Sequence, residues 1–283
     1  MAEIKCSQGC VFSGLTTKVS LASGNNQIRH MSYENFEQSR TASYDHVLIL
    51  ASRLPSENVE IQQFRMVNDQ TLKILRQISH RSGKIPKITF VSTFSLYDPN
   101  ATMINEESPV SGGSSYARSK LEMEDALLHW ADNQNAHLLI ARMPVFAYPG
   151  GKANFLSRLI EATKNKSTFT LTNPESSFSA VFDVDNLVDL MGSDWHGRQI
   201  VNCAAAGDIN FNELAEMAIR FGLKDVIWGK AKRPSQQVSS ARLVSYLGRM
   251  PSAKEIVSRL FELEIRDGIL PSYSSTNFPT KSV

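Results

Sequence analysis

The sequence has few cysteines, no large excess of charge of either sign and no long hydrophobic run. Three cysteines occur among 283 residues, and no further Cys or His lies near Cys6 and Cys10 to complete a zinc site. A metal site is therefore not expected, and a reduced, cytoplasmic setting fits best. Thirty basic against 28 acidic residues give no reason to expect nucleic-acid binding. We recognise neither a membrane span nor a signal peptide, so no membrane partner is expected.

Apolar runs alternate with amphipathic stretches, which is typical of an α/β fold. We expect strands over residues 3–6, 27–31, 46–51, 87–92, 137–142, 169–171 and 180–182. We expect helices over residues 14–23, 59–79, 116–133, 153–165, 211–221 and 253–264. This order predicts a doubly wound, Rossmann-like and mostly parallel sheet over residues 1–150. A smaller substrate-binding lobe over residues 151–271 is interleaved with it, and a flexible tail covers residues 272–283.

Tyr116 and Lys120 form a Tyr-x-x-x-Lys pair at the start of the helix predicted over residues 116–133. Residues four apart lie on one face of a helix, so these two side chains are neighbours. A lysine ammonium beside a phenol lowers the pKa of the phenol, which then donates and accepts protons near neutral pH. The same spacing also arises by chance, so the pair alone leaves a catalytic and a structural interpretation open.

Further motifs follow the predicted strands. The hydroxyl-rich segment S-T-F-S at residues 92–95 follows one strand, at the edge where open α/β sheets bind ligands, although small polar residues are also common in turns. The segment E-E-S-P lies at residues 106–109, and R-M-P-V-F-A-Y-P-G lies at residues 142–150. The segment F-D-V-D-N lies at residues 182–186, within the expected substrate-binding lobe.

In order and spacing, these motifs resemble the extended short-chain dehydrogenase/reductase family, the NAD-dependent sugar-nucleotide epimerases, dehydratases and reductases, over about residues 45–250. Thr93 is similar to the catalytic Ser/Thr of that family, four residues before Tyr97. The resemblance implies that Tyr116 is the general acid/base. It implies that Lys120 lowers the pKa of this tyrosine and holds the nicotinamide ribose. Thr93 would orient the reacting carbonyl or hydroxyl.

The resemblance further implies NADP or NAD as cofactor and a nucleotide-linked sugar as substrate. The implied cofactor-binding residues are Gly9, Gly14, Arg29, Ala51 and Lys120. The implied substrate-binding residues are Thr93, Phe94, Val145 and Arg233. Val145 stands where the family has a substrate-contacting Asn, and a solvated basic loop is the simpler explanation of Arg233. Members of this family often dimerise through a four-helix bundle, here built from the helices over residues 59–79 and 116–133.

The glycine fingerprint of the family, G-x-x-G-x-x-G, is altered in this chain. In the best register its positions are Gln8, Val11 and Gly14, and a β-branched Val11 would crowd the pyrophosphate. Either the turn is reshaped and still binds a dinucleotide, or the scaffold has become a binding or regulatory protein. Arg29 and His30 stand where an acidic residue is usual, which slightly favours NADP, although solvated surface side chains explain them equally well.

The resemblance favours a reductase or an epimerase over a dehydratase. Family dehydratases carry an Asp-Glu pair after the catalytic Thr, and Phe94 and Ser95 stand at these positions here. Water elimination then lacks its acid and its base. We therefore expect an NAD(P)-dependent 4-keto-sugar reductase or epimerase, with a non-catalytic binding protein on the same scaffold as the alternative.

Overall fold

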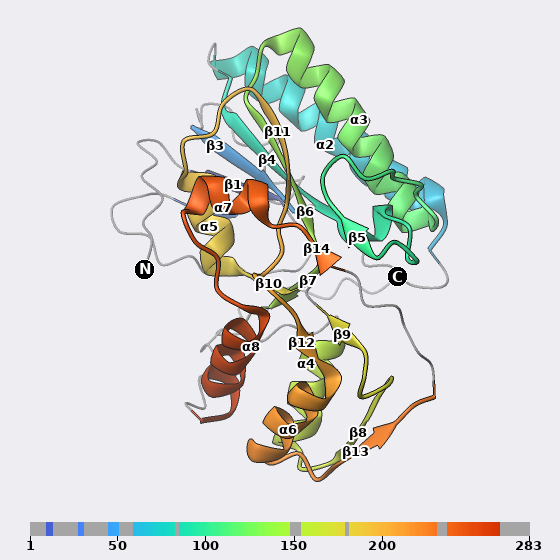
Figure 1. Ribbon diagram of the computed structural model, residues 1–283. Helices are drawn as coiled ribbons and strands as arrows, with labels where there is room; N and C mark the ends of the chain where they lie inside the picture. The colour runs from blue at the N-terminus through green and yellow to red at the C-terminus, as the bar shows by residue number, and fades with distance from the viewer. Residues whose placement is uncertain are drawn as a thin grey trace, which may run out of the picture.

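The computed structural model describes residues 10–13, 28–30, 45–50, 59–82, 85–147, 154–178, 181–230 and 237–266. A six-stranded parallel sheet with the order β11-β6-β4-β3-β1-β2 lies at the centre (Figure 1). The strand order reverses between β1 and β3, so the predicted doubly wound fold is confirmed. The strands are β1 Cys10–Ser13, β2 Ile28–His30, β3 His46–Ile49, β4 Lys87–Thr93, β6 Leu138–Met143 and β11 Arg198–Asn202.

Strand β1 does not lie where the sequence predicted the first strand. The stretch predicted over residues 3–6 lies outside the described residues, and β1 instead contains Val11. Val11 pairs with Arg29 of β2 on one side and with Val47 of β3 on the other. The assignment of Val11 to the glycine turn is therefore wrong, because a residue paired on both sides of a ladder is not in a turn. Gly14 follows directly after β1, and its own geometry lies outside the described residues.

Helices cover both faces of the sheet, with α2 and α3 on one face and α5 and α7 on the other (Figure 1). Side chains alternate between the faces of a strand, which explains why both faces carry apolar residues. In β3, Val47 and Ile49 belong to the core beneath α2 and α3, whereas Leu48 belongs to the opposite core. The bounds of these helices are Ile61–Ser82, Ser115–Gln134, Val184–Gly192 and Ala241–Leu247.

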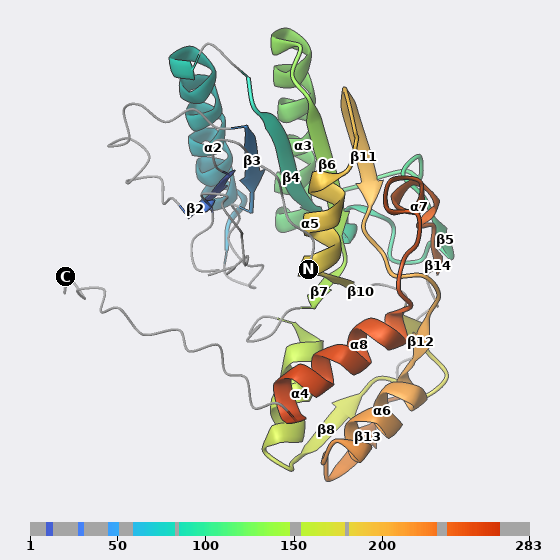
Figure 2. The ribbon, with the colours of Figure 1, turned by 90° about the vertical axis from the view of Figure 1, so that its left-hand side faces the viewer.

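A smaller lobe lies beyond the carboxyl end of the sheet (Figure 2). It contains α4 Phe155–Lys164, α6 Phe211–Arg220, α8 Ala253–Phe261, the π-helix η2 Glu262–Arg266 and the parallel pair β8 Thr168–Leu171 and β13 Asp225–Trp228. The short pairs are β7 Val145–Ala147 with β10 Val181–Asp183, β9 Ser177–Phe178 with β12 Ile209–Asn210, and β5 Met103–Ile104 with β14 Gln237–Val238. Because α5, β11 and α7 return to the main sheet, the chain passes between the two parts more than once.

Most predicted elements within the described residues form, with ends that differ by a few residues. The predicted helix over residues 14–23 and the tail over residues 272–283 lie outside the described residues. None of the described helices is long and apolar enough to cross a membrane.

The turn before α3 depends on a glycine. Gly112 has a φ of +57°, in the left-handed region that favours glycine. A Cβ at this position would stand 3.0 Å from the Cα of Arg118, which is backbone and cannot move aside easily. The neighbouring Ser111 N–H donates to the carbonyl of Leu96, so this turn also ties the start of α3 to the segment after β4.

We expect Gly112→Ala to lower the free energy of unfolding by about 1–3 kcal/mol, because the alanine combines a strained φ with a backbone clash. Gly113→Ala is the matched control, since nothing lies within 4 Å of its added Cβ. Urea unfolding followed by circular dichroism measures both variants. Equal midpoints for the two variants would contradict the role of Gly112.

A buried histidine lies at the amino end of β3. His46 Nε2 lies 2.8 Å from Thr89 Oγ1, and its ring packs edge-on against Trp195 at 5.8 Å. Burial, aided by the charge of Lys87, lowers the pKa of His46 from 6.5 to about 3. The folded protein therefore keeps His46 neutral at a pH at which the unfolded chain protonates it.

The free energy of unfolding should therefore decrease as the pH drops below about 6.5, because only the unfolded chain gains the proton. His46 contributes up to roughly 1.4 kcal/mol per pH unit to this decrease. We expect His46→Gln to flatten the fall of the unfolding free energy between about pH 6.5 and pH 4. An unchanged slope in His46→Gln would show that other groups cause the acid sensitivity.

Candidate active site

The carboxyl end of β4 leads into a hydroxyl-bearing turn. Thr93 is the last residue of β4 and is buried, and a 3₁₀ turn, η1 Phe94–Leu96, follows it. Thr93 Oγ1 accepts a hydrogen bond from the backbone N–H of Ser95 at 3.2 Å and lies 3.3 Å from Ser95 Oγ. Because Ser95 is exposed, this second hydroxyl connects Thr93 with the surface. The sequence pointed to Thr93 but gave Ser95 no role.

Tyr116 and Lys120 lie on one face of α3, as predicted. Ser114 caps this helix by accepting from the N–H of Ala117 at 3.1 Å, so both residues fall within its first two turns. The Nζ of Lys120 lies 5.9 Å from the centre of the Tyr116 ring. The half-buried Tyr116 ring also packs edge-on against Phe64 of α2, at 5.8 Å.

Lys120 brings α3 to the end of β4. Its side chain is buried, with Nζ donating to the carbonyl of Val91 at 2.8 Å and lying 4.7 Å from the centre of the Phe90 ring. Burial lowers the pKa of Lys120 to about 7, against the opposing effect of the Glu124 carboxylate. Val91 lies two residues before Thr93, so the predicted trio shares one region at the carboxyl edge of the sheet.

Hydrogen bonds from helix α2 fix the position of α3 at this point. Asn68 Nδ2 donates to the carbonyl of Ser119 at 2.9 Å and to its hydroxyl at 3.1 Å. Ser119 stands directly before Lys120, so an amide from the neighbouring helix holds the turn that carries both predicted catalytic residues. Arg65 adds a bidentate bond to Glu122 nearer the surface.

A buried polar network lies beneath the Thr93 segment. Arg142 of β6 donates to the carboxylate of Glu124 through Nη2 at 2.7 Å and through Nε at 3.2 Å. Its Nη1 donates to Tyr97 Oη at 2.9 Å, and Tyr97 Oη donates to Asn202 Oδ1 at 2.7 Å. Burial opposes the charge of Arg142, but Glu124 and Tyr97 raise the pKa of Arg142 above its usual range. Burial raises the pKa of Tyr97, with Arg142 acting in the opposite direction.

The structure describes some of the remaining predicted site residues and not others. Phe94 lies in η1, where its ring packs edge-on against Tyr97 at 5.9 Å. Val145 begins β7 and pairs with Val181 of β10, and Arg29 lies in β2. The predicted residues that lie outside the described part of the chain are Gly9, Gly14, Ala51 and Arg233.

Glu124 and Asn202 are site residues that the sequence reading missed. Glu124 lies one turn beyond Lys120, among the buried positions of α3 that include Met123 and Leu127. A charged residue inside an apolar helical stripe signals a buried ionic contact, so the sequence did contain a clue. Asn202 gave no such signal, because its partner Tyr97 stands 105 residues away.

Comparison with known proteins identifies the family to which this chain belongs. A sequence model of the NAD dependent epimerase/dehydratase family matches residues 34–204, which is more than half of the chain. A search of curated proteins found no match.

Solved structures share the fold at low sequence identity. The structure of RMD from Pseudomonas aeruginosa complexed with NADPH is 18% identical, covers 90% of this chain and 96% of its own, and has a TM-score of 0.73. UDP-glucose 4-epimerase from Thermotoga maritima, with UDP-glucose, is 14% identical, covers 92% and 99%, and scores 0.72. UDP-glucuronic acid 4-epimerase from Bacillus cereus, in complex with NAD, is 16% identical, covers 86% and 82%, and scores 0.69.

These likenesses establish a shared Rossmann-like architecture, and the family model covers the segment from β3 to the end of β11 that carries Thr93, Tyr116 and Lys120. The protein therefore belongs to the NAD-dependent epimerase/dehydratase family.

Proposed function

We propose that the protein is an NAD(P)-dependent reductase or epimerase of a nucleotide-linked sugar. The observation that carries this proposal is the burial of the Lys120 ammonium between Tyr116 and the end of β4. Burying an ammonium costs free energy, and a helix packed on a sheet has no structural need for one at this point. The position beside a half-buried phenol and a strand-end threonine supports a catalytic use.

The donors at this edge of the sheet fit the nicotinamide end of a dinucleotide. An ammonium has three hydrogen-bond donors, and Lys120 directs one of them to the Val91 carbonyl, which orients the others. A bound nicotinamide cofactor supplies or accepts the hydride. Lys120 would hold the ribose and stabilise negative charge on the Tyr116 oxygen, and Tyr116 would transfer the proton to or from the sugar oxygen.

The hydroxyls of the η1 turn support reduction or epimerisation rather than dehydration. In the free protein the Thr93 hydroxyl donates to Ser95 Oγ at 3.3 Å, and on binding it would turn to donate to the sugar carbonyl or hydroxyl. Phe94 and Ser95 bring no carboxylate to this turn, so an elimination would lack its acid and base. Solved structures that share this fold were obtained with NADPH, with NAD or with UDP-glucose, which agrees with this class of substrate and cofactor.

The alternative, a non-catalytic binding protein on the same scaffold, loses part of its basis. It depended on crowding of the pyrophosphate by Val11, which lies inside β1 rather than in the turn after it. Fluorescence titration with NADPH and NADH separates the two: saturable binding supports the enzyme, and absence of binding of both at millimolar levels supports the alternative. The same titrations measure the preference for NADP that the sequence suggested through Arg29.

The cytoplasmic setting stays a prediction.

Tyr116→Phe should lower turnover by about 10²–10⁴-fold, because it removes the proton donor and leaves the ring packed on Phe64. Turnover is measured as epimerisation of UDP-glucose, UDP-glucuronic acid and UDP-N-acetylglucosamine with NAD⁺ or NADP⁺, and as oxidation of NADH or NADPH by a 4-keto-sugar nucleotide. Tyr246→Phe, on α7, is the matched control and should keep wild-type turnover. Full activity of Tyr116→Phe, with an unchanged circular dichroism spectrum, would overturn the assignment.

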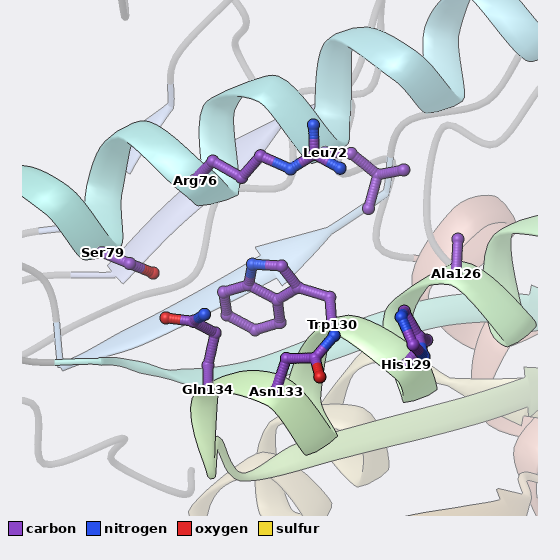
Figure 3. Close-up of a pocket in the computed structure, with 8 residues that line it drawn as sticks. All are labelled: Leu72, Arg76, Ser79, Ala126, His129, Trp130, Asn133 and Gln134. Carbon is purple, nitrogen blue, oxygen red and sulfur yellow. The ribbon is translucent and has the colours of Figure 1, made fainter.

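We also propose that α2 and α3 form a homodimer contact. An open groove of about 700 Å³ lies between their carboxyl-terminal halves, at the opposite end of α3 from Tyr116. The Trp130 indole lies in this groove, between the two helices (Figure 3). The lining residues are Leu72, Arg76, Ser79, Ala126, His129, Trp130, Asn133 and Gln134. An amphipathic helix pair with such a groove can accept the same pair from a second copy.

Ala126→Arg should convert a dimer to a monomer, because a long cation would replace a small residue in the wall of the groove. Light scattering coupled to size exclusion measures the mass of each species. Glu216→Arg, on α6 of the smaller lobe, is the control and should leave the mass unchanged. A monomeric wild-type protein at micromolar concentration would refute the dimer.

A further inference from the structure

Three strands end in a row of polar residues on the face of the sheet that α3 covers. Ser92 of β4 and Asn202 of β11 both pair in register with Arg142 of the strand between them. All three are buried. Further back along the same strands this face carries apolar residues such as Phe90 and Ile140, so the polar row is confined to the carboxyl end. The proposed site with Thr93, Tyr116 and Lys120 lies at the same carboxyl end of the sheet.

The row is connected to the Thr93 turn through Tyr97. The N–H of Tyr97 donates to the carbonyl of Phe94 and closes the η1 turn, while its hydroxyl lies between Arg142 and Asn202. The N–H of Asn202 donates to Glu106 Oε1 at 2.8 Å, which draws in the loop before α3. A displacement of Arg142 would therefore move the turn that presents Thr93.

Among the fully buried groups of the cluster two cations share one carboxylate, while the half-buried Glu106 carboxylate joins through the Asn202 N–H. Arg142 and Lys120 are both 4% exposed cations, and the 1% exposed Glu124 is the carboxylate that lies between them in sequence and structure. Glu124 bonds Arg142 directly and lies one helical turn from Lys120. Within the described part of the chain, the other ionisable group that lies near Lys120 is Tyr116 on α3. Phe90 and Val91 of β4 contribute only a ring face and a carbonyl. One buried carboxylate thus serves two cations.

We propose that Glu124 is a positioning residue, which fixes the Thr93 turn through Arg142 and Tyr97 and supplies the buried countercharge of Lys120. The proposal rests on the function proposed above, since it concerns how that site is held. It assigns Glu124 no contact with substrate or cofactor. Both tests below use the free protein, so they stand even if the chain binds no dinucleotide.

The first test measures how firmly the turn is held. Hydrogen exchange followed by mass spectrometry should show several-fold faster exchange over residues 93–97 in Glu124→Gln, because the turn loses the anchor of its tyrosine. Glu122→Gln on the same helix breaks only the more exposed pair with Arg65 and should leave this exchange unchanged. Strand β8 in the smaller lobe should exchange at the wild-type rate in both variants. Equal exchange over residues 93–97 in the two variants would overturn the positioning role.

The second test measures how stability depends on pH, which responds to the charge of Glu124. A role of Glu124 in packing alone would leave this pH dependence unchanged. In wild type, the titration of Lys120 lowers stability as pH drops from about 10.5 to about 7, since the unfolded chain protonates this lysine first. This contribution levels off once folded Lys120 is also protonated. Without Glu124, the pKa of folded Lys120 falls further, so in Glu124→Gln the loss continues below pH 7. The folded-to-unfolded ratio of this variant, relative to wild type, should be about tenfold lower at pH 6 than at pH 9.

Two further variants make this result specific. Tyr97→Phe keeps all charges, so it should speed exchange over residues 93–97 with no such dependence on pH. Lys120→Met added to Glu124→Gln should abolish the dependence. If Glu124→Gln folds only near pH 9, that recovery supports the countercharge. If its destabilisation is the same at pH 6 and pH 9, or if it does not fold at either pH while Tyr97→Phe behaves as wild type, the proposal fails.

Discussion

The buried contact between Arg142 and Glu124 joins the central sheet to the helix that carries Tyr116 and Lys120. Removing one partner of such a pair leaves an uncompensated charge in a low-dielectric interior, which typically costs about 3–5 kcal/mol. The strand, the helix and the Thr93 turn are therefore held in one relative position. The geometry of the proposed site depends on this constraint more than on the apolar cores, which tolerate small shifts of their members.

Two regions of α3 have different roles. Its first turns face the end of β4 and contain the Tyr116 and Lys120 pair, and its later turns line the groove around Trp130. The helix also packs against α2, through Asn68 near the proposed site, and farther along the two helices line the groove together. A second copy bound at the groove would stiffen the helix pair without touching the reacting groups, which is a common arrangement for an enzyme that dimerises.

The sequence predicted the site better where the signal was local. Tyr116 and Lys120 are related by one helical turn, and Thr93 ends a strongly apolar strand, so the residues that carry the family resemblance lie in short local motifs. Strand β1 was misplaced because its four residues, C-V-F-S, give little periodicity, and the glycine pattern was aligned without knowing where the strand ended. Glu124 was overlooked because its partner lies on β6, 18 residues farther along the chain.

By itself, the sequence determined the doubly wound fold and the family resemblance, because hydrophobic periodicity and short-range spacing are written in consecutive residues. Through that resemblance it also predicted Thr93, Tyr116 and Lys120 as site residues. Only the tertiary structure decided that Lys120 is buried against Val91, that Thr93 is bonded to Ser95, and that Glu124 serves two cations. Burial and long-range pairing arise from how α3 packs on β4 and β6. The charge state and orientation of each catalytic side chain depend on that packing, which no local pattern encodes.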